Sequence, residues 1–186
     1  MSHLNDMATT HNNRGVKHAV QYQFDQANEH LSQAIRAISG ESSPVPYWNA
    51  ALCELRETGL SERVYQLMTQ AEYLGFDSAA HFITAWNHNS AGMNALNEGQ
   101  YAECIAEFQS AIRWSPFTIA LYHWNLGLGL LKMPGRETDG QQQIRIAANC
   151  GYVPAKEALT SESGDDVDWD SVVKFAADVA QFFLGG

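Results

Sequence analysis

The apolar residues of this chain recur at intervals of three and four positions, and no stretch alternates apolar and polar residues with the two-residue period of a strand. One segment shows the helical spacing clearly, at Tyr101, Cys104, Phe108 and Ala111. Pro116 follows this segment, where a proline stops a helix. Short clusters of Gly, Ser and Pro separate the helical segments and indicate turns. The pattern predicts an all-α chain.

The chain also repeats itself. Residues 88–114 match residues 11–37, 77 positions earlier: both segments begin with His-Asn and carry Ala-Ile-Arg near their end. Two later segments match in the same order, 76 positions apart: residues 123–136 match 47–60, and residues 144–156 match 68–80. Because the matches keep their order along the chain, we interpret them as an internal duplication.

Small residues, aromatic residues and a proline recur within residues 85–118 in the order and spacing of a 34-residue tetratricopeptide repeat (TPR): Gly92, Tyr101, Cys104, Phe108, Ala111 and Pro116. This segment resembles the TPR family, and residues 8–39, 44–75 and 119–150 resemble it with fewer matching positions. The resemblance implies pairs of antiparallel helices that approach closely at the small residues. The aromatic residues then fill the space between one hairpin and the next.

The duplication and the resemblance predict an α-solenoid of about four TPR-like helix hairpins, in two duplicated pairs, closed by a C-terminal capping helix. We expect a flexible N-terminus (1–10), hairpins one and two (11–83), hairpins three and four (84–159), an acidic spacer (160–168) and a C-terminal amphipathic helix (169–184). That helix either caps the last hairpin or docks onto a partner.

Composition and charge narrow the function classes. The 186 residues carry a net charge of −10, half of which lies in residues 161–186, and the absence of clustered Lys and Arg excludes nucleic acid as a partner. Three cysteines without ligand spacing indicate free thiols in a reducing compartment. The first residues lack the apolar core of a signal peptide, and no apolar run is long enough to span a membrane. We therefore expect a soluble, cytoplasmic protein that binds neither nucleic acid nor membrane.

No pattern in the sequence predicts catalysis, a cofactor or a metal site. His11 and His18 are seven positions apart, as are His81 and His88, whereas metal ligands on one helix are usually three or four apart. His11, His88 and His123 occupy equivalent positions of their first helices, which suggests a repeated packing role. The motifs of nucleophilic hydrolases and of nucleotide-binding loops are absent.

The TPR resemblance implies a binding groove lined by the first helix of each hairpin. The family often places an asparagine there, two residues before the close-packing Gly or Ala, to bind the backbone of a peptide. In this chain those positions are Asn13, Asn49, Ser90 and Asn125. A side-chain amide offers both a donor and an acceptor, as an extended backbone requires. The alternative is that these residues only face water on the helix surface.

Two tryptophans and two basic residues complete the predicted groove. Trp48 and Trp124 lie one residue before the asparagines, where they would anchor a ligand or, alternatively, fill the core between hairpins. Arg56 and Lys132 lie about two turns further along, on the same general face, where either can meet a carboxylate.

These features predict a non-enzymatic protein–protein interaction module, an adaptor or a chaperone-like protein, that binds a peptide or a helix of a partner in the groove. The alternative is a regulatory subunit, an inhibitor or an immunity-type protein that binds a folded partner through its convex faces or its C-terminal helix. Either way the expected partner is a protein or a peptide segment, and self-association is compatible with both.

Overall fold

The computed structural model describes residues 2–38 and 43–160, and within these ranges the chain is helical, with turns and short loops between the helices and no strand. The predicted C-terminal helix and, apart from Thr160, the predicted acidic spacer lie outside the described residues. The chain divides into two compact units, Met1–Ile83 and Thr84–Gly186, which we call unit 1 and unit 2.

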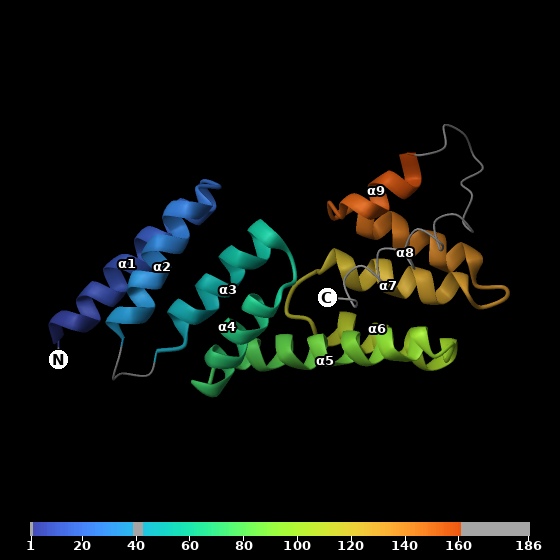
Figure 1. The fold of residues 1–186 in the computed structure, drawn as a ribbon, viewed down its shortest axis with the longest axis horizontal. Helices are drawn as coiled ribbons and strands as arrows, with labels where there is room; N and C mark the ends of the chain where they lie inside the picture. The colour runs from blue at the N-terminus through green and yellow to red at the C-terminus, as the bar shows by residue number, and fades with distance from the viewer. Residues whose placement is uncertain (1, 39–42, 161–186) are drawn as a thin grey trace. The chain divides into compact units, whose positions relative to one another are not determined.

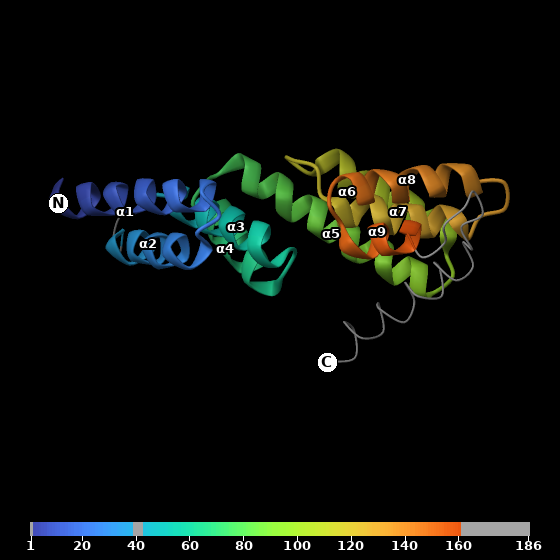
Figure 2. The same ribbon diagram turned by 90° about the horizontal axis from the view of Figure 1, so that it is seen from above.

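Unit 1 contains two helix hairpins and the beginning of a fifth helix. Its helices are α1 (Ser2–Val20), α2 (Phe24–Ala37), α3 (Val45–Thr58), α4 (Glu62–Tyr73) and the start of α5 (Asp77–Asn97). Each helix from α1 to α4 packs against the next, and α1 also contacts α3 (Figures 1 and 2). Small buried residues such as Ala27 and Ala34 allow the close packing, and the Ser61 hydroxyl caps α4 by accepting a hydrogen bond from the amide of Val64.

Unit 2 continues from α5 with four more helices: α6 (Tyr101–Trp114), α7 (Ala120–Leu131), α8 (Glu137–Asn149) and α9 (Val153–Thr160). From α6 onwards each helix packs against the next. One hydrophobic cluster joins α5, α6 and α7 around Phe108 and Leu126, and a second joins α7, α8 and α9 around Trp124 and Ile144. This order of neighbouring helices is that of a helical repeat.

The turns repeat with the sequence. Left-handed backbone occurs at three pairs of matching positions: Gly59 and Gly135 (φ 79° and 79°), Gly75 and Gly151 (φ 85° and 94°), and Tyr22 and Gly99 (φ 59° and 75°). Glycine adopts this conformation without steric cost, whereas Tyr22 is a non-glycine residue there. The two matched halves of the sequence therefore fold with the same turns.

The close approach of paired helices also repeats. A Cβ atom added to Gly15 would lie 2.6 Å from a side-chain carbon of Leu31, and one added to Gly92 would lie 2.6 Å from the ring of Phe108. Gly92 and Phe108 lie 77 positions after Gly15 and Leu31. In both hairpins a missing side chain on the first helix thus leaves room for a large side chain on the second.

The structure departs from the sequence-based boundaries at both ends of the repeat. The helix α1 begins at Ser2, within the segment 1–10 that we expected to be flexible. Ala8 is only 4% exposed, so this part of the helix packs within unit 1 in spite of its mostly polar composition. A short further helix, α9, forms the end of the range 84–159 that we assigned to hairpins three and four. Among the described residues no helix is both long and apolar enough to span a membrane.

Candidate functional site

Two asparagine pairs connect first helices of consecutive hairpins. In unit 1 the Nδ2 of Asn49 on α3 donates a hydrogen bond to the Oδ1 of Asn12 on α1, at 2.9 Å. In unit 2 the Nδ2 of Asn125 on α7 donates to the Oδ1 of Asn89 on α5, at 2.8 Å. The two bonds occupy matching positions of the duplicated sequence, so each unit holds adjacent first helices together in the same way.

The two asparagine pairs differ in burial. Asn125 is 5% exposed, whereas Asn49 and Asn12 are half-buried. An asparagine amide has two N–H groups and a carbonyl oxygen, so a single donated bond leaves Asn49 with one N–H and its oxygen. Because Asn89 is half-buried as well, the two pairs differ at their donor, which is accessible at Asn49 and buried at Asn125.

The two predicted tryptophans make matching aromatic contacts. The ring centroid of Trp48 lies 4.8 Å from that of Phe76, and the ring centroid of Trp124 lies 5.6 Å from that of Tyr152. Trp124 and Tyr152 lie 76 positions after Trp48 and Phe76, respectively. Trp124 is 4% exposed and belongs to the hydrophobic cluster of α7, α8 and α9. Of the two roles that we considered for it, ligand anchor or core residue, Trp124 has the second. Trp48 is half-buried and keeps part of its ring at the surface.

Arg56 on α3 is exposed and held by Tyr22 in the turn between α1 and α2. Its Nη2 donates a hydrogen bond to the Tyr22 hydroxyl at 2.6 Å, and its guanidinium carbon lies 4.3 Å from the centre of the Tyr22 ring. Both contacts are with a neutral side chain, so they orient the guanidinium without cancelling its charge. Lys132 is also exposed, but the position that matches Tyr22 in unit 2 is Gly99, which has no ring.

The structure thus brings part of the predicted set together in unit 1. Asn49 and Arg56 are seven positions apart on α3 and share one side of that helix. Each bonds a residue of the α1 hairpin, and Asn13 is exposed on α1 beside Asn12. We call the surface formed by Tyr22, Asn49 and Arg56 the α1–α3 face; Asn13 on α1 and Trp48 on α3 adjoin it in the sequence, and the Trp48 ring packs against Phe76. Of the remaining predicted residues, Ser90 and Lys132 are exposed in unit 2, whereas Trp124 and Asn125 are buried.

Sequence reasoning missed the roles of Asn12 and Tyr22. The recurrence of Asn12 as Asn89 was visible, but the pairing of each with an asparagine of the next first helix depends on how the helices pack. For Tyr22 the usable signal was its match to Gly99 in the duplication, because a residue aligned with a turn glycine is expected in a turn.

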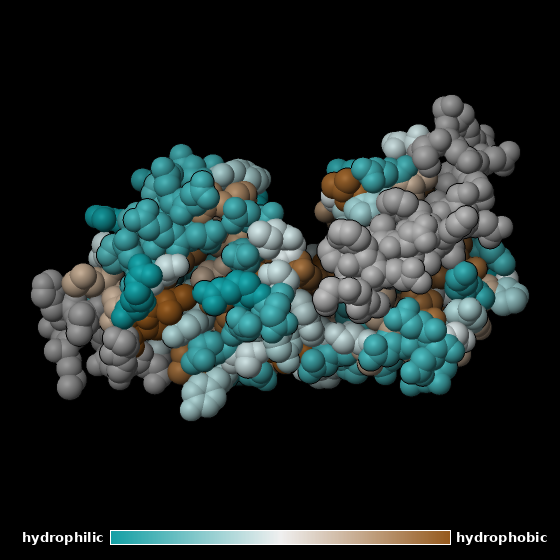
Figure 3. All heavy atoms as spheres, viewed as in Figure 1, coloured by the Kyte–Doolittle hydropathy of each residue, from teal (hydrophilic) through white to brown (hydrophobic). Residues whose placement is uncertain are grey.

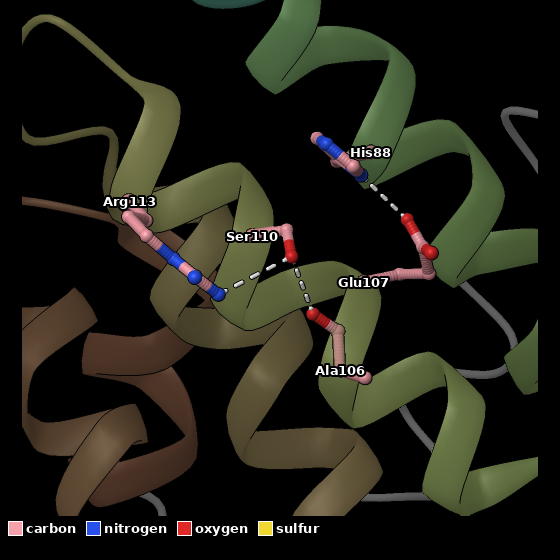
Figure 4. Close-up of polar contacts among 5 residues, drawn as sticks. All are labelled: His88, Ala106, Glu107, Ser110 and Arg113. Atoms are coloured by element: carbon pink, nitrogen blue, oxygen red, sulfur yellow. Dashed lines mark hydrogen bonds and ion pairs between the residues drawn. The ribbon is translucent and has the colours of Figure 1, made fainter.

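A second set of polar contacts joins the two helices within each of three hairpins. His11 meets His30 (Nδ1 to Nδ1, 3.2 Å), His88 meets Glu107 (2.7 Å) and His123 meets Gln143 (2.8 Å). Figure 4 shows His88 on α5 pointing toward Glu107 on α6. All three histidines lie on first helices and bridge to the second helix.

Two of the three cysteine thiols of the chain, Cys53 and Cys104, are buried. Burial raises the pKa of both Cys53 and Cys104 to about 11, and at Cys53 the charges of Glu57 and Glu54 raise it further. Both thiols are therefore protonated and weakly nucleophilic at neutral pH. Among the residues that the structure describes, no group of three or more His, Cys, Asp or Glu side chains is arranged to hold a metal ion.

One hollow of about 190 Å³ lies in unit 2, between the end of α6 and the start of α7. Tyr122 lines it together with mostly uncharged side chains. The Tyr122 hydroxyl is buried without a hydrogen-bond partner among the described residues, and burial raises its pKa. Because the hydroxyl has almost no accessible surface, a molecule in the hollow does not reach it.

Much of the visible surface of the described chain is hydrophilic, with hydrophobic side chains in scattered patches (Figure 3). On the α1–α3 face, positioned polar, aromatic and cationic side chains coincide. Comparison of the chain with protein-family models, with curated proteins and with solved structures gives no match.

Proposed function

We propose that this chain is a TPR-like, non-enzymatic interaction module that binds an extended segment of a partner protein across the α1–α3 face of unit 1. One observation carries the proposal: Asn49 and Arg56, on one side of α3, each donate a hydrogen bond to the α1 hairpin while remaining accessible. The repeated hairpins, turns and glycine contacts support the TPR-like architecture.

Asn49 suits the backbone of the bound segment. The bond to Asn12 fixes the orientation of its amide, and the free N–H and carbonyl oxygen match the alternating acceptors and donors of an extended peptide. Asn13 is exposed one residue from Asn12 and offers a second amide on the neighbouring side of α1. A preoriented amide loses little rotational freedom on binding, which favours affinity.

Arg56 suits a carboxylate of the bound segment, either an acidic side chain or a free C-terminus. The Tyr22 ring and hydroxyl hold the guanidinium in place, and a guanidinium binds a carboxylate through two parallel hydrogen bonds. Trp48, half-buried beside Asn49, offers apolar surface for a side chain of the peptide. The expected ligand is therefore an extended peptide with one carboxylate and one apolar anchor.

A peptide selection tests this proposal. A random peptide library is selected against the full chain, and the affinity of the best peptides is measured by fluorescence anisotropy. We expect Asn49→Ala and Arg56→Gln each to weaken binding about tenfold, since each removes one oriented polar contact worth about 1.4 kcal/mol. Amidating the C-terminus of the peptide, or replacing its acidic residues, distinguishes the two sources of carboxylate.

Unit 2 supplies matched controls. Lys132→Gln removes the cation that matches Arg56, and Ser90→Ala changes the position that matches Asn13. Neither substitution should change the affinity by more than about twofold. Equal losses in both units, or selected peptides that bind Asn49→Ala and Arg56→Gln as tightly as the parent chain, would contradict binding at the α1–α3 face.

A further inference from the structure

Three histidines gather where α1 packs against α2. His11 and His18 lie two turns apart on one side of α1, and His30 comes from α2. The ring centroid of His30 lies 5.4 Å from that of His11 and 5.5 Å from that of His18. All three side chains are half-buried, so water reaches the cluster.

The contact between His11 and His30 joins two nitrogens that both have a lone pair when the rings are deprotonated at Nδ1. Their separation is 3.2 Å. A Zn–N bond of about 2.0–2.1 Å and a tetrahedral angle place two imidazole nitrogens on one ion about 3.3 Å apart. The pair therefore already has the spacing of two neighbouring ligands; the proton shared in the hydrogen bond has to leave, and the two rings have to turn so that both lone pairs point at the ion.

We propose that His11 and His30 bind one divalent transition-metal ion through their Nδ1 atoms, with water at the remaining coordination positions. Imidazole nitrogen suits Zn²⁺, Ni²⁺ and Cu²⁺, which accept mixed coordination by histidine and water. The bound ion links α1 to α2 and so stabilises the first hairpin, because it binds the folded chain in preference to the unfolded one.

His18 positions His30. Its ring is nearly parallel to that of His30, at 17°, and its Nδ1 is hydrogen-bonded to the Oε1 of Gln23 at 2.7 Å. This hydrogen bond fixes the His18 ring, and the stacked contact then limits rotation of His30. Oriented ligands of this kind hold a metal more tightly than freely rotating ones.

The duplication places a different pair at the matching position of unit 2. His88 and Glu107 lie 77 positions after His11 and His30, and their 2.7 Å contact is a hydrogen bond between an imidazole and a carboxylate. The hairpin geometry is thus the same, but only unit 1 offers two imidazoles. The spacing of histidines along one helix did not predict the His11–His30 pair, because His11 lies on α1 and His30 on α2.

Isothermal titration calorimetry of the full chain, without an affinity tag, tests the metal site with ZnSO₄ and NiSO₄ as separate probes. We expect one ion bound per chain, and at least about tenfold weaker binding in both His30→Gln and His11→Gln. His123→Gln removes an imidazole from unit 2 and should leave the affinity within about twofold of the parent chain. Far-UV circular dichroism verifies that each variant is folded.

A second variant adds a site instead of removing one. Glu107→His should raise the stoichiometry from one ion to two, because it creates the same His–His pair on α5 and α6. The melting temperature of the parent chain should rise with zinc, and that of His30→Gln should not. The proposal is overturned if the parent chain binds neither ion, if His30→Gln binds as tightly as the parent, or if Glu107→His gains no second ion.

Discussion

In unit 1 the helix α3 carries Trp48 and Asn49 half-buried, whereas in unit 2 the matching helix α7 carries Trp124 and Asn125 almost completely buried. The contacts themselves are the same in kind, an aromatic ring against each tryptophan and an asparagine bond to the preceding first helix. A duplicated pattern has thus kept its internal contacts while changing which of its residues remain accessible.

The residues further along each helix explain the difference. The helix α3 has Glu54 and Glu57, whereas the matching residues are Leu130 on α7 and Met133 just after its end, so α3 keeps a polar side where the matching positions are apolar. Residues 124–130 of α7 are all buried. One copy of the repeat thus keeps an accessible side on α3, whereas α7 forms part of the core of its unit.

The closest helix contact in unit 2 gives the largest expected effect. A Cβ added to Gly127 would lie 2.9 Å from the carbonyl oxygen of Gly140, and one added to Gly140 would lie 2.9 Å from that of Gly127. The matching residues of unit 1 are Ala51 and Val64. We expect Gly127→Ala with Gly140→Val to lower the free energy of unfolding by about 2 kcal/mol or more, measured by chemical denaturation, because backbone atoms cannot move aside easily.

A matched control for this exchange is Ala51→Gly in unit 1, which should cost only about 1 kcal/mol from the lower helix propensity of glycine. A double variant of unit 2 that is as stable as the parent chain would show that α7 and α8 do not depend on this close approach.

The asparagine pairs give the next largest effect. Asn125→Ala removes an almost completely buried amide together with its hydrogen bond to the half-buried Asn89, and we expect a loss of about 2 kcal/mol in the free energy of unfolding. Asn49→Ala breaks a half-buried bond and should cost about 1 kcal/mol, because water replaces the lost donor at Asn12. Equal losses in the two variants would contradict the difference in burial between the units.

Alkaline pH tests one buried thiol in each unit. The pKa of Cys53 and of Cys104 is about 11 in the folded chain, raised from an ordinary value near 9. A raised pKa means that the protonated thiol is favoured by folding, so this stability is complete below pH 9 and is lost as the pH rises towards 11. We expect a loss of about 1 kcal/mol per thiol at pH 10.5, relative to the matching Cys→Ala variant.

The exposed Cys150 is the control for the buried thiols. The variant Cys150→Ala should lose stability with pH just as the parent chain does. The double variant Cys53→Ala, Cys104→Ala should not match the parent chain: if both lose free energy of unfolding equally as the pH rises, the two thiols titrate normally in the folded chain.

The smallest effect is expected from Glu107→Gln. The His88–Glu107 contact has side chains that are 32% and 30% exposed, and a partly exposed ion pair contributes only about 0.5 kcal/mol. Urea denaturation at low salt should detect this loss, and 0.5 M NaCl should reduce it because salt screens the charges. A loss that does not change with salt would show that the contact acts as a neutral hydrogen bond.

Part of the candidate site could be predicted from the sequence. The register of the repeat indicated Asn49 and Arg56, and the hairpin contacts of His11, His88 and His123 follow from their equivalent positions. The register of the repeat did not predict burial, since Asn49 and Asn125 occupy matching positions but differ in exposure.

The sequence by itself determined that this chain is helical, where its turns fall and which segments correspond, because apolar spacing and turn glycines act over a few neighbouring residues. Only the tertiary structure decided that His30 meets His11, that Tyr22 holds Arg56 and that Asn125 is buried. These contacts join different helices, and their geometry is set by how closely the helices pack.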